Sequence, residues 1–331
     1  MSTHGLYTVS EVTTLIEAGR VLLLGGDEAL LVQLPAGQWI AGTSANFMAP
    51  EGGTTSRDRI FASDITEHAA AVDLRSYSAE ELPGIGADYP ENGFTVLVVP
   101  GLSEIHSVYA RDVQSYAGVF NAPLFGWISG VHVSEIGLRS PKTFAGSNIA
   151  QNNRAVALHV TLPPGEAASI DIINLFSQGG GDDIEFTSEG FEVSGECLIG
   201  GKPGNLAAHI TANALDTKLP LVADYNGAMI NVSIRAVDAQ TGKVDLYAPV
   251  FKGIKYRFAN PVPDYISEFD ARLHSLDADS IYVSCNCILN FLYAELEGKK
   301  TGTIVGPVTF GEIAYILLNQ TLVYLSISKP D

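Results

Sequence analysis

The chain has 331 residues, 46% of them hydrophobic, which is enough for about two domains with sizeable cores. Its 37 acidic residues outnumber 19 basic ones and leave a net charge of −18, so the surface repels phosphate backbones and anionic lipids. We therefore expect no nucleic-acid or membrane partner. The first twenty residues do not resemble a secretory signal, and no apolar run reaches the ~18 residues of a membrane-spanning helix. Both observations predict a cytoplasmic protein.

The start of the chain is predicted to alternate short strands with one helix. Ser10 can cap a helix over 11–18, and the apolar runs 21–24 and 29–34 have strand length, with a Gly-Gly-Asp-Glu turn between them. A third strand, 38–42, ends in Thr43 and Ser44. Small residues after a strand let backbone N–H groups face a cavity, although a tight strand exit is the alternative.

Residues 51–93 are predicted to form a loop, a strand and then a region of weak hydrophobic periodicity. The glycine-rich segment 51–56 is predicted to be a mobile loop that leads into a strand over 59–65. Residues 66–93 indicate short polar helices and turns, because Pro83, Gly84, Gly86 and Pro90 interrupt them.

The clearest strand of the first half is FTVLVV at 94–99. Pro100 and Gly101 end it, and Ser103 can cap a helix that continues to about 119. His106 lies in the first turn of that helix, where ligands gather at the carboxyl edge of open sheets. A capping or surface role for this histidine is the alternative.

Trp127 lies among glycines in the segment 122–130 and can be either the wall of a pocket or a core residue. A long strand is predicted at 154–161. The tract 179–183 is expected to be a loop between strands near 170–175 and 191–199. The run 200–204 resembles a linker, so we place a domain boundary between residues 200 and 201.

Beyond the linker, Asn205 can cap a helix that reaches residue 213. Further strands are predicted at 228–237, 243–247 and 254–258, and a helix at 264–276. The chain then forms a buried strand that ends in Cys285 and Cys287, a helix, a second strand and a closing strand. No internal repeat of short fixed period is visible.

No metal or cofactor motif emerges from the spacing of the reactive residues. The histidines at 4, 68, 106, 132, 159, 209 and 274 include no pair four residues apart, so no metal site is predicted. A cysteine before a helix, such as Cys287, can be a nucleophile, but a buried structural thiol is the alternative. Glu312 lies in an apolar, glycine-rich setting, where its carboxylate must meet hydrogen-bond donors or a cationic group of a ligand.

Several of these segments resemble FIST domains, which are proposed sensory modules for small ligands in bacterial signalling. The resemblance rests on Gly42-Thr43-Ser44, the segment 123–127 with Gly130, the strand 154–161 and the hairpin strands of 232–258. The segments most similar to the family are Phe310-Gly311-Glu312-Ile313 and Asn319-Gln320-Thr321. It implies a FIST-N-like domain over 1–200 and a FIST-C-like domain over 201–331. The family usually carries an arginine shortly after the cysteine, and Asn290 at that place implies a different ligand or none.

We therefore predict an α+β protein of two β-rich halves, with mixed sheets flanked by a few helices. Its predicted function is a small-molecule-binding sensory module without catalytic activity, which passes its signal to a separate signalling protein. The predicted ligand is an amino acid or another carboxylate, and no cofactor is expected. The predicted site gathers residues from converging strand ends: Thr43, Ser44, Ser103, His106, Trp127, Cys287 and Glu312.

Two other functions stay open. One is an enzyme that uses Cys287 or Cys285 with His106. The other is a scaffold protein whose cavities are filled by its own side chains.

Overall fold

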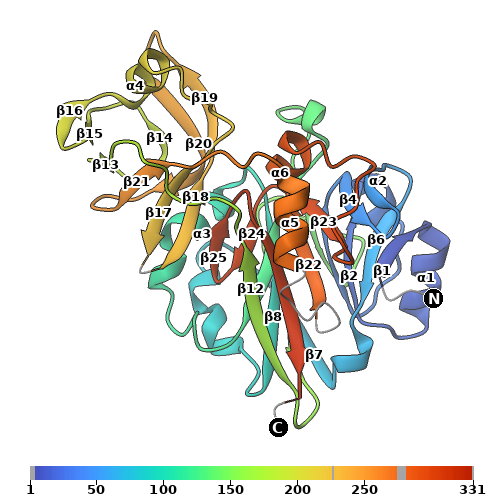
Figure 1. The fold of residues 1–331 in the computed structure, drawn as a ribbon. Helices are drawn as coiled ribbons and strands as arrows, with labels where there is room; N and C mark the ends of the chain where they lie inside the picture. Colours follow the sequence, from blue (N-terminus) through green and yellow to red (C-terminus); the bar gives the residue numbers. More distant parts are fainter. Residues whose placement is uncertain (1–3, 226, 274–280, 330–331) are drawn as a thin grey trace. The chain divides into compact units, whose positions relative to one another are not determined.

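The computed structural model describes residues 4–225, 227–273 and 281–329. Mixed sheets and a few short helices make up the fold, which confirms the predicted α+β class (Figure 1). The chain forms two compact units. Unit 1 contains residues 1–173, 269–317 and 322–331, and unit 2 contains residues 174–268 and 318–321. The boundary expected between residues 200 and 201 falls inside unit 2, so these units are not the two domains drawn from the sequence.

The first sheet of unit 1 is centred on a parallel pair of strands. These are β2 (Leu22–Gly26) and β3 (Trp39–Thr43), joined through the short helix α2 (Glu28–Leu31). Antiparallel strands flank the pair in the order β1-β6-β2-β3-β10. Their bounds are β1 (His4–Tyr7), β6 (Ile60–Asp64) and β10 (Thr143–Ala145), and helix α1 (Val9–Glu17) follows β1.

The second sheet has the same centre. The parallel strands β8 (Gly93–Pro100) and β9 (Leu124–Ser129) are joined through α3 (Glu104–Asp112) and the 3-10 turn η3 (Val113–Ser115). The order is β25-β24-β9-β8-β11-β7. The flanking strands are β7 (Ala71–Tyr77), β11 (Ala155–Thr161), β24 (Glu312–Ala314) and β25 (Ile316–Leu318). The other 3-10 turns of unit 1 are η1 (Thr66–His68), η2 (Leu82–Asp88) and η4 (Val133–Glu135).

The third sheet repeats the arrangement once more. Its parallel pair is β22 (Ile281–Cys287) and β23 (Gly306–Thr309), joined through α6 (Ile288–Tyr293). The order is β12-β26-β22-β23-β4-β5. The flanking strands are β4 (Asn46–Ala49), β5 (Gly52–Thr55), β12 (Ala167–Ile173) and β26 (Leu322–Ser328).

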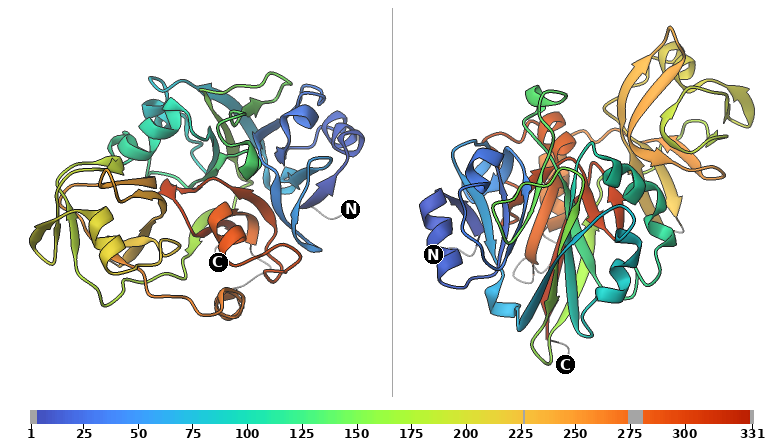
Figure 2. Two further views of the ribbon diagram at one scale, coloured as in Figure 1. Left: turned by 90° about the horizontal axis from the view of Figure 1, so that it is seen from above. Right: turned by 180° about the vertical axis from the view of Figure 1, so that it is seen from behind.

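Unit 1 is therefore a threefold structural repeat with exchanged strands (Figure 2). Repeat 1 covers 4–64, repeat 2 covers 71–161, and repeat 3 covers 167–173, 281–317 and 322–328. After its parallel pair, each repeat sends one strand into the sheet of another: β4 pairs with β23, β10 with β3, and β24 with β9. Each repeat then returns to its own sheet through β6, β11 or β26. The circular exchange ties the three sheets into one unit.

Unit 2 interrupts repeat 3 between β12 and β22 and contains two sheets. The larger has the order β16-β15-β13-β21-β17-β18, and the smaller has the order β14-β20-β19. The strands of the larger sheet are β13 (Ile184–Phe186), β15 (Cys197–Ile199), β16 (Lys202–Gly204), β17 (Leu221–Tyr225), β18 (Ala228–Val232) and β21 (Lys255–Phe258). Those of the smaller are β14 (Gly190–Val193), β19 (Ile234–Asp238) and β20 (Lys243–Val250). The helix of this unit is α4 (Leu206–Ala212), and the boundary between the two units falls within α5 (Tyr265–Leu273).

The Asn-Gln-Thr segment, the most FIST-like part of the sequence, belongs to unit 2. Asn231 Nδ2 donates to the carbonyl of Asn319 at 3.1 Å, and Ser233 Oγ donates to Gln320 Oε1 at 2.6 Å. These residues are buried, so the paired polar groups hold the segment in place without exposing it.

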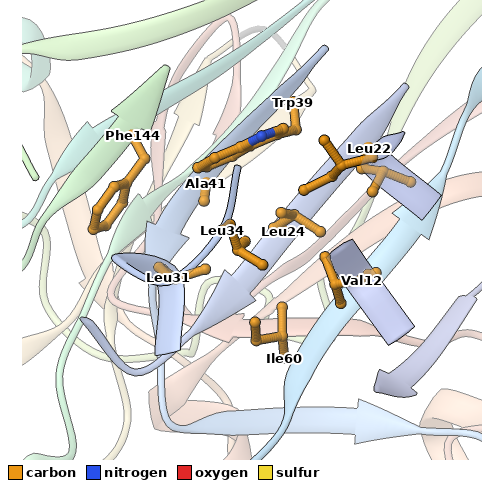
Figure 3. Packing of buried hydrophobic residues seen from close by; sticks show 11 residues of the cluster. Val12, Leu22, Leu24, Leu31, Leu34, Trp39, Ala41, Ile60 and Phe144 are labelled. Carbon is orange, nitrogen blue, oxygen red and sulfur yellow. The ribbon is translucent and has the colours of Figure 1, made fainter. Parts of the chain in front are cut away.

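The core of the first sheet shows why its elements form (Figure 3). Apolar side chains of α1, β2, α2, β3, β6 and β10 meet there, and Trp39 at its centre is fully buried. The indole of Trp39 donates to the carbonyl of Pro35 at 3.0 Å. The buried members of this cluster are Val12, Ile16, Leu22, Leu24, Leu31, Leu34, Trp39, Ala41, Ile60, Ala62 and Phe144.

Several local predictions were wrong near the N-terminus. The segment 29–34 is not a strand, because residues 28–31 form α2, and Asp27 caps this helix through a bond from Ala29 N at 2.9 Å. The predicted hairpin turn is instead the end of β2. Thr8, and not Ser10, caps α1. The segment 51–56 is not a mobile loop, because it contains β5, and Gly53 N donates to the carbonyl of Lys299 at 2.8 Å.

Two further predictions differ in the middle of the chain. Residues 66–93 contain β7, a seven-residue edge strand of the second sheet. The predicted linker is a tight turn between β15 and β16, in which Gly200 and Gly201 adopt φ of 56° and 76°. The helix expected over 264–276 covers 265–273, and residues 274–276, including His274, lie outside the described residues.

Candidate functional site: the strand-end groove of repeat 2

The three crossing points of unit 1 meet at the carboxyl ends of the parallel strands. Gly130 N donates to the carbonyl of Thr43 at 2.8 Å, and Ile128 N donates to that of Gly311 at 2.8 Å. Ser44 Oγ donates to the carbonyl of Val308 at 2.7 Å. These bonds bring together the strand ends of all three repeats.

This meeting point is filled by protein. Trp127 lies opposite Glu312 in the β9–β24 register, and the two side chains are 1% and 0% exposed. Gly42 has no space for a side chain, because a Cβ there would lie 2.8 Å from Trp127 Nε1. The small cavity beside Trp127 has a volume of about 10 Å³, room for about one water molecule.

The other predicted site residues at this point are also buried. The Oγ1 atom of Thr43 accepts from Lys142 N at 2.8 Å. Cys287 is the last residue of β22, directly before α6, and is 1% exposed. Cys285 Sγ donates to the carbonyl of Gly126 at 3.3 Å, and burial and the charge of Glu312 raise the pKa of its thiol well above the usual value. Cys285 is thus held as a neutral thiol.

A groove of about 430 Å³ opens next to this filled centre, at the carboxyl end of β8. Residues 101–104, 137–141 and 152–153 line it. Ser103 is the predicted site residue among them, and the other six do not line it. A volume between about 300 and 1,000 Å³ is typical of small-molecule sites.

The first wall of the groove is the start of α3. Ser103 Oγ accepts from His106 N at 3.2 Å and donates to the carbonyl of Pro100 at 2.5 Å, so the predicted helix cap is confirmed. His106 Nδ1 accepts from Leu102 N at 3.3 Å. Burial lowers the pKa of His106 to about 4, which keeps its ring neutral near pH 7. Asn153 Oδ1 accepts from Ile105 N at 3.2 Å and joins a second wall to the helix.

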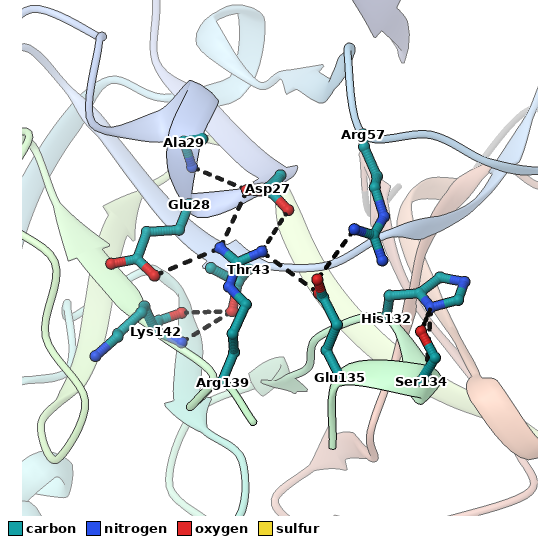
Figure 4. Close-up of polar contacts among 10 residues, drawn as sticks. All are labelled: Asp27, Glu28, Ala29, Thr43, Arg57, His132, Ser134, Glu135, Arg139 and Lys142. Atoms are coloured by element: carbon teal, nitrogen blue, oxygen red, sulfur yellow. Dashed lines mark hydrogen bonds and ion pairs between the residues drawn. The ribbon is translucent and has the colours of Figure 1, made fainter. Parts of the chain in front are cut away.

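The opposite wall is fixed by ion pairs (Figure 4). Arg139 Nη1 and Nη2 lie 3.0 and 3.2 Å from the two carboxylate oxygens of Asp27, the cap of α2. The same guanidinium lies 3.6 Å from Glu28 and 3.4 Å from Glu135. Arg57 Nη1 bonds Glu135 at 3.0 Å. A residue of repeat 2 is thereby attached to the strand end of repeat 1.

Asp27 is ionised in this cluster. Burial acts to raise the pKa of its carboxyl group, but the hydrogen bonds from Arg139 and Ala29 N outweigh burial, and the pKa lies below its ordinary value.

The groove exists in repeat 2 because its connections are longer. Residues 101–103 separate β8 from α3, whereas Asp27 alone separates β2 from α2, and α6 follows β22 directly. Residues 130–142 connect β9 to β10, whereas the equivalent crossings are 44–45 and 310–311. Both long connections of repeat 2 contribute residues to the lining of the groove.

Two leucines of the groove are exposed. Leu138 is 82% exposed and Leu102 is 51% exposed. Sequence reasoning missed them, together with Arg139, Asn152 and Asn153, because two separate loops bring these residues to α3. One feature of the sequence could have indicated the groove. Leu138 is an aliphatic residue between Gly137 and Arg139, in a segment with no strand or helix pattern.

The described part of the chain contains no group of three or more His, Cys, Asp or Glu residues that could hold a metal ion. Among the helices described, none is long and apolar enough to cross a membrane. A family model, described as a family of unknown function (DUF6976), matches residues 7–328. No curated protein matches the chain. The family match does not bear on the resemblance to FIST domains, which stays a prediction.

Proposed function

The chain belongs to DUF6976, a family of unknown function, and from that premise we propose that it binds a small molecule in the strand-end groove of repeat 2. The observation that carries the proposal is the groove itself, about 430 Å³ of space at the carboxyl end of β8, between the long connections of repeat 2. Ligands of open α/β sheets gather outside the carboxyl ends of parallel strands, where connections meet around a space.

A binding role agrees with the chemistry of the lining better than a catalytic one does. The hydroxyl of Ser103 is already a donor to Pro100 and an acceptor from His106, so it caps a helix rather than standing ready as a nucleophile. The ring of His106 accepts from Leu102 N. The alternative of a cysteine-dependent enzyme draws no support from Cys285, whose pKa is raised. Selective, pH-dependent alkylation of one cysteine under native conditions would revive that alternative.

The sensory part of the proposal is supported by the connection 130–142, which forms one wall of the groove. The connection 130–142 contributes Leu138 and Arg139 to the groove, and ion pairs of Arg139 and Arg57 attach this connection to neighbouring elements. A ligand that contacts Leu138 or Arg139 changes the free energy of that attachment, and a separate signalling protein can recognise the altered connection. We propose the module as a cytoplasmic, non-catalytic sensor on this basis.

Native mass spectrometry of gently purified protein, followed by a thermal-shift screen of amines, amino acids, carboxylates and nucleotides, tests the proposal. A ligand that binds only the folded state must raise the melting temperature with concentration. In Ser140→Trp, a large side chain is placed in the groove, and we expect the shift to be lost. Gln114→Trp, at an exposed position outside the lining, is the matched control and should keep it. An equal shift in wild type and Ser140→Trp would contradict the proposed site.

A further inference from the structure

The groove is lined by two charged side chains, a carboxylate and a guanidinium, and only the guanidinium is held in ion pairs within the described residues. This difference indicates the charge of the ligand that the proposed function requires. Glu104 and Arg139 are the charged residues of the lining. Glu104 is exposed and forms no ion pair within the described ranges, whereas Arg139 contacts the three carboxylates Asp27, Glu28 and Glu135. An incoming cation meets a carboxylate that has no partner.

An incoming anion meets the opposite situation. To reach Arg139 it must compete with three carboxylates, of which Asp27 holds the guanidinium with both oxygens. Like charges at such separations repel, and bidentate arginine–carboxylate pairs are among the stronger ion pairs in proteins. Lys142 follows Pro141 of the lining, and Figure 4 shows its ammonium group pointing away from Arg139.

Leu102 provides an independent observation. Its backbone has φ of 59°, in the left-handed region, where a Cβ crowds the following carbonyl oxygen. The side chain is half exposed, so burial within the chain offsets little of the cost of this crowding. Glycine or asparagine is the ordinary choice at such a position. A leucine there is explained if its side chain contacts something that occupies the groove, which it lines with the exposed Leu138.

From this geometry we infer that the groove takes a small aliphatic amine, with its ammonium group at Glu104 and its apolar part between Leu102 and Leu138. The amide groups of Asn152 and Asn153 and the hydroxyl of Ser140 line the same groove and supply hydrogen-bonding groups around the cation. This inference rests on the proposed function and narrows it, because the sequence alone pointed to an amino acid or a carboxylate.

Ligand-observed saturation-transfer NMR with three probes of one shape tests the inference on the full chain. The probes are isopentylamine, isopentanol and isovalerate, which share an apolar part and differ in charge. We expect isopentylamine to bind about fivefold more tightly than the other two, the factor that corresponds to ~1 kcal/mol for a partly exposed ion pair. The preference should shrink at high salt, because screening weakens exposed charge pairs.

Two variants connect the result to the residues. Glu104→Gln should remove the preference for the amine and leave isopentanol binding unchanged. Leu102→Gly should weaken all three probes while leaving the melting temperature of the free protein unchanged or higher, because glycine relieves the left-handed backbone. Glu91→Gln and Leu292→Ala, which change an exposed carboxylate and an exposed leucine outside the lining, are the controls and should bind as wild type.

The outcomes separate this inference from the proposed function. If isovalerate or isopentanol binds as tightly as the amine and Ser140→Trp abolishes that binding, the groove is a ligand site and the amine inference is overturned. If isopentylamine gives no saturation transfer, the inference is overturned as well, and the thermal-shift screen with Ser140→Trp still decides whether the groove binds another class of ligand.

Discussion

Repeats 1 and 2 of unit 1 have the same strand–helix–strand centre and differ at its carboxyl end. In repeat 1, Asp27 alone joins β2 to α2, and the crossing to β4 uses only residues 44–45. In repeat 2, residues 101–103 and 130–142 take these places, and a groove of about 430 Å³ lies between them. The sheets of the two repeats share one strand–helix–strand frame, and the longer connections of repeat 2 enclose a groove at its strand end. Loops on a rigid scaffold commonly carry binding functions.

The largest expected effect is a loss of stability on mutation at the filled centre, with ligand binding in the groove retained. Trp127→Ala removes a fully buried indole at the meeting point of the repeats, and we expect the free energy of unfolding to fall by about 3–5 kcal/mol. Chemical denaturation measures this change. Ligand binding at a temperature where the variant stays folded should be retained, and so should binding by Glu312→Gln. Loss of binding in both variants, with Ser140→Trp unaffected, would place the site at the filled centre instead.

Acid titration distinguishes repeat 2 from repeat 1, because the buried histidines of the described chain, His106 and His159, both belong to repeat 2. Thr95 Oγ1 lies 2.7 Å from His159 Nδ1, and Tyr77 Oη lies 2.8 Å from its Nε2 and 2.8 Å from Asp88. Because Tyr77 donates its one proton to the carboxylate of Asp88, His159 carries its hydrogen on Nε2 and Nδ1 accepts from Thr95.

Burial lowers the pKa of His159 to about 4, and that of His106 to about 4. The unfolded chain, with histidine pKa near 6.5, binds more protons between these values. The stability contributed by each neutral ring is therefore complete above about pH 6.5 and is lost as the pH falls toward 4, by about 3 kcal/mol for each histidine. Denaturation midpoints between pH 7 and 4 measure the slope. His159→Gln should flatten it, and an unchanged slope would show that this ring is not held neutral.

A smaller effect is expected at the helix start that forms the groove wall. Ser103→Ala removes the cap of α3 and should cost about 1 kcal/mol of folding free energy, whereas Ser103→Asp should keep it. Ser115→Ala, on the exposed turn after α3, is the control. If Ser103→Ala is as stable as wild type, the helix start is not supported as described.

The smallest expected effect concerns the attachment between repeats 1 and 2. Arg139→Ala breaks the contacts to Asp27, Glu28 and Glu135 on a half-exposed surface, and we expect a loss of about 0.5–1 kcal/mol. Hydrogen exchange across residues 130–142 should speed up. Arg111→Ala, which breaks an exposed pair with Asp112, should leave exchange in that segment unchanged. Equal exchange in Arg139→Ala and wild type would mean that the ion pairs do not hold the wall.

The sequence was sufficient where local chemistry decides the structure. The apolar run of β8, the cap at Ser103 and the cap at Asn205 depend on neighbouring residues, and all three were predicted correctly. It failed at α2, because a short apolar run fits a buried strand or a helix equally well. It also missed β7, in which Asp73 and Arg75 face outward as polar residues on an edge strand do.

Non-local pairing could not be predicted in the same way. The exchange of β4, β10 and β24 among three sheets leaves no short-range pattern, so the threefold repeat was invisible in the sequence. For the site, Ser103 was identified from its place after a buried strand. Arg139 and Asn152 were missed, because only folding brings their loops to the start of α3.

Hydrogen-exchange mass spectrometry with and without a ligand from the thermal-shift screen shows whether ligand binding belongs to the groove of repeat 2. We expect a ligand to protect residues 101–104 and 130–142, while the equivalent strand ends of the other repeats, residues 27–28 and 287–288, exchange unchanged. Protection at those other strand ends, or throughout unit 2 but not at repeat 2, would contradict the assignment of ligand binding to the open groove.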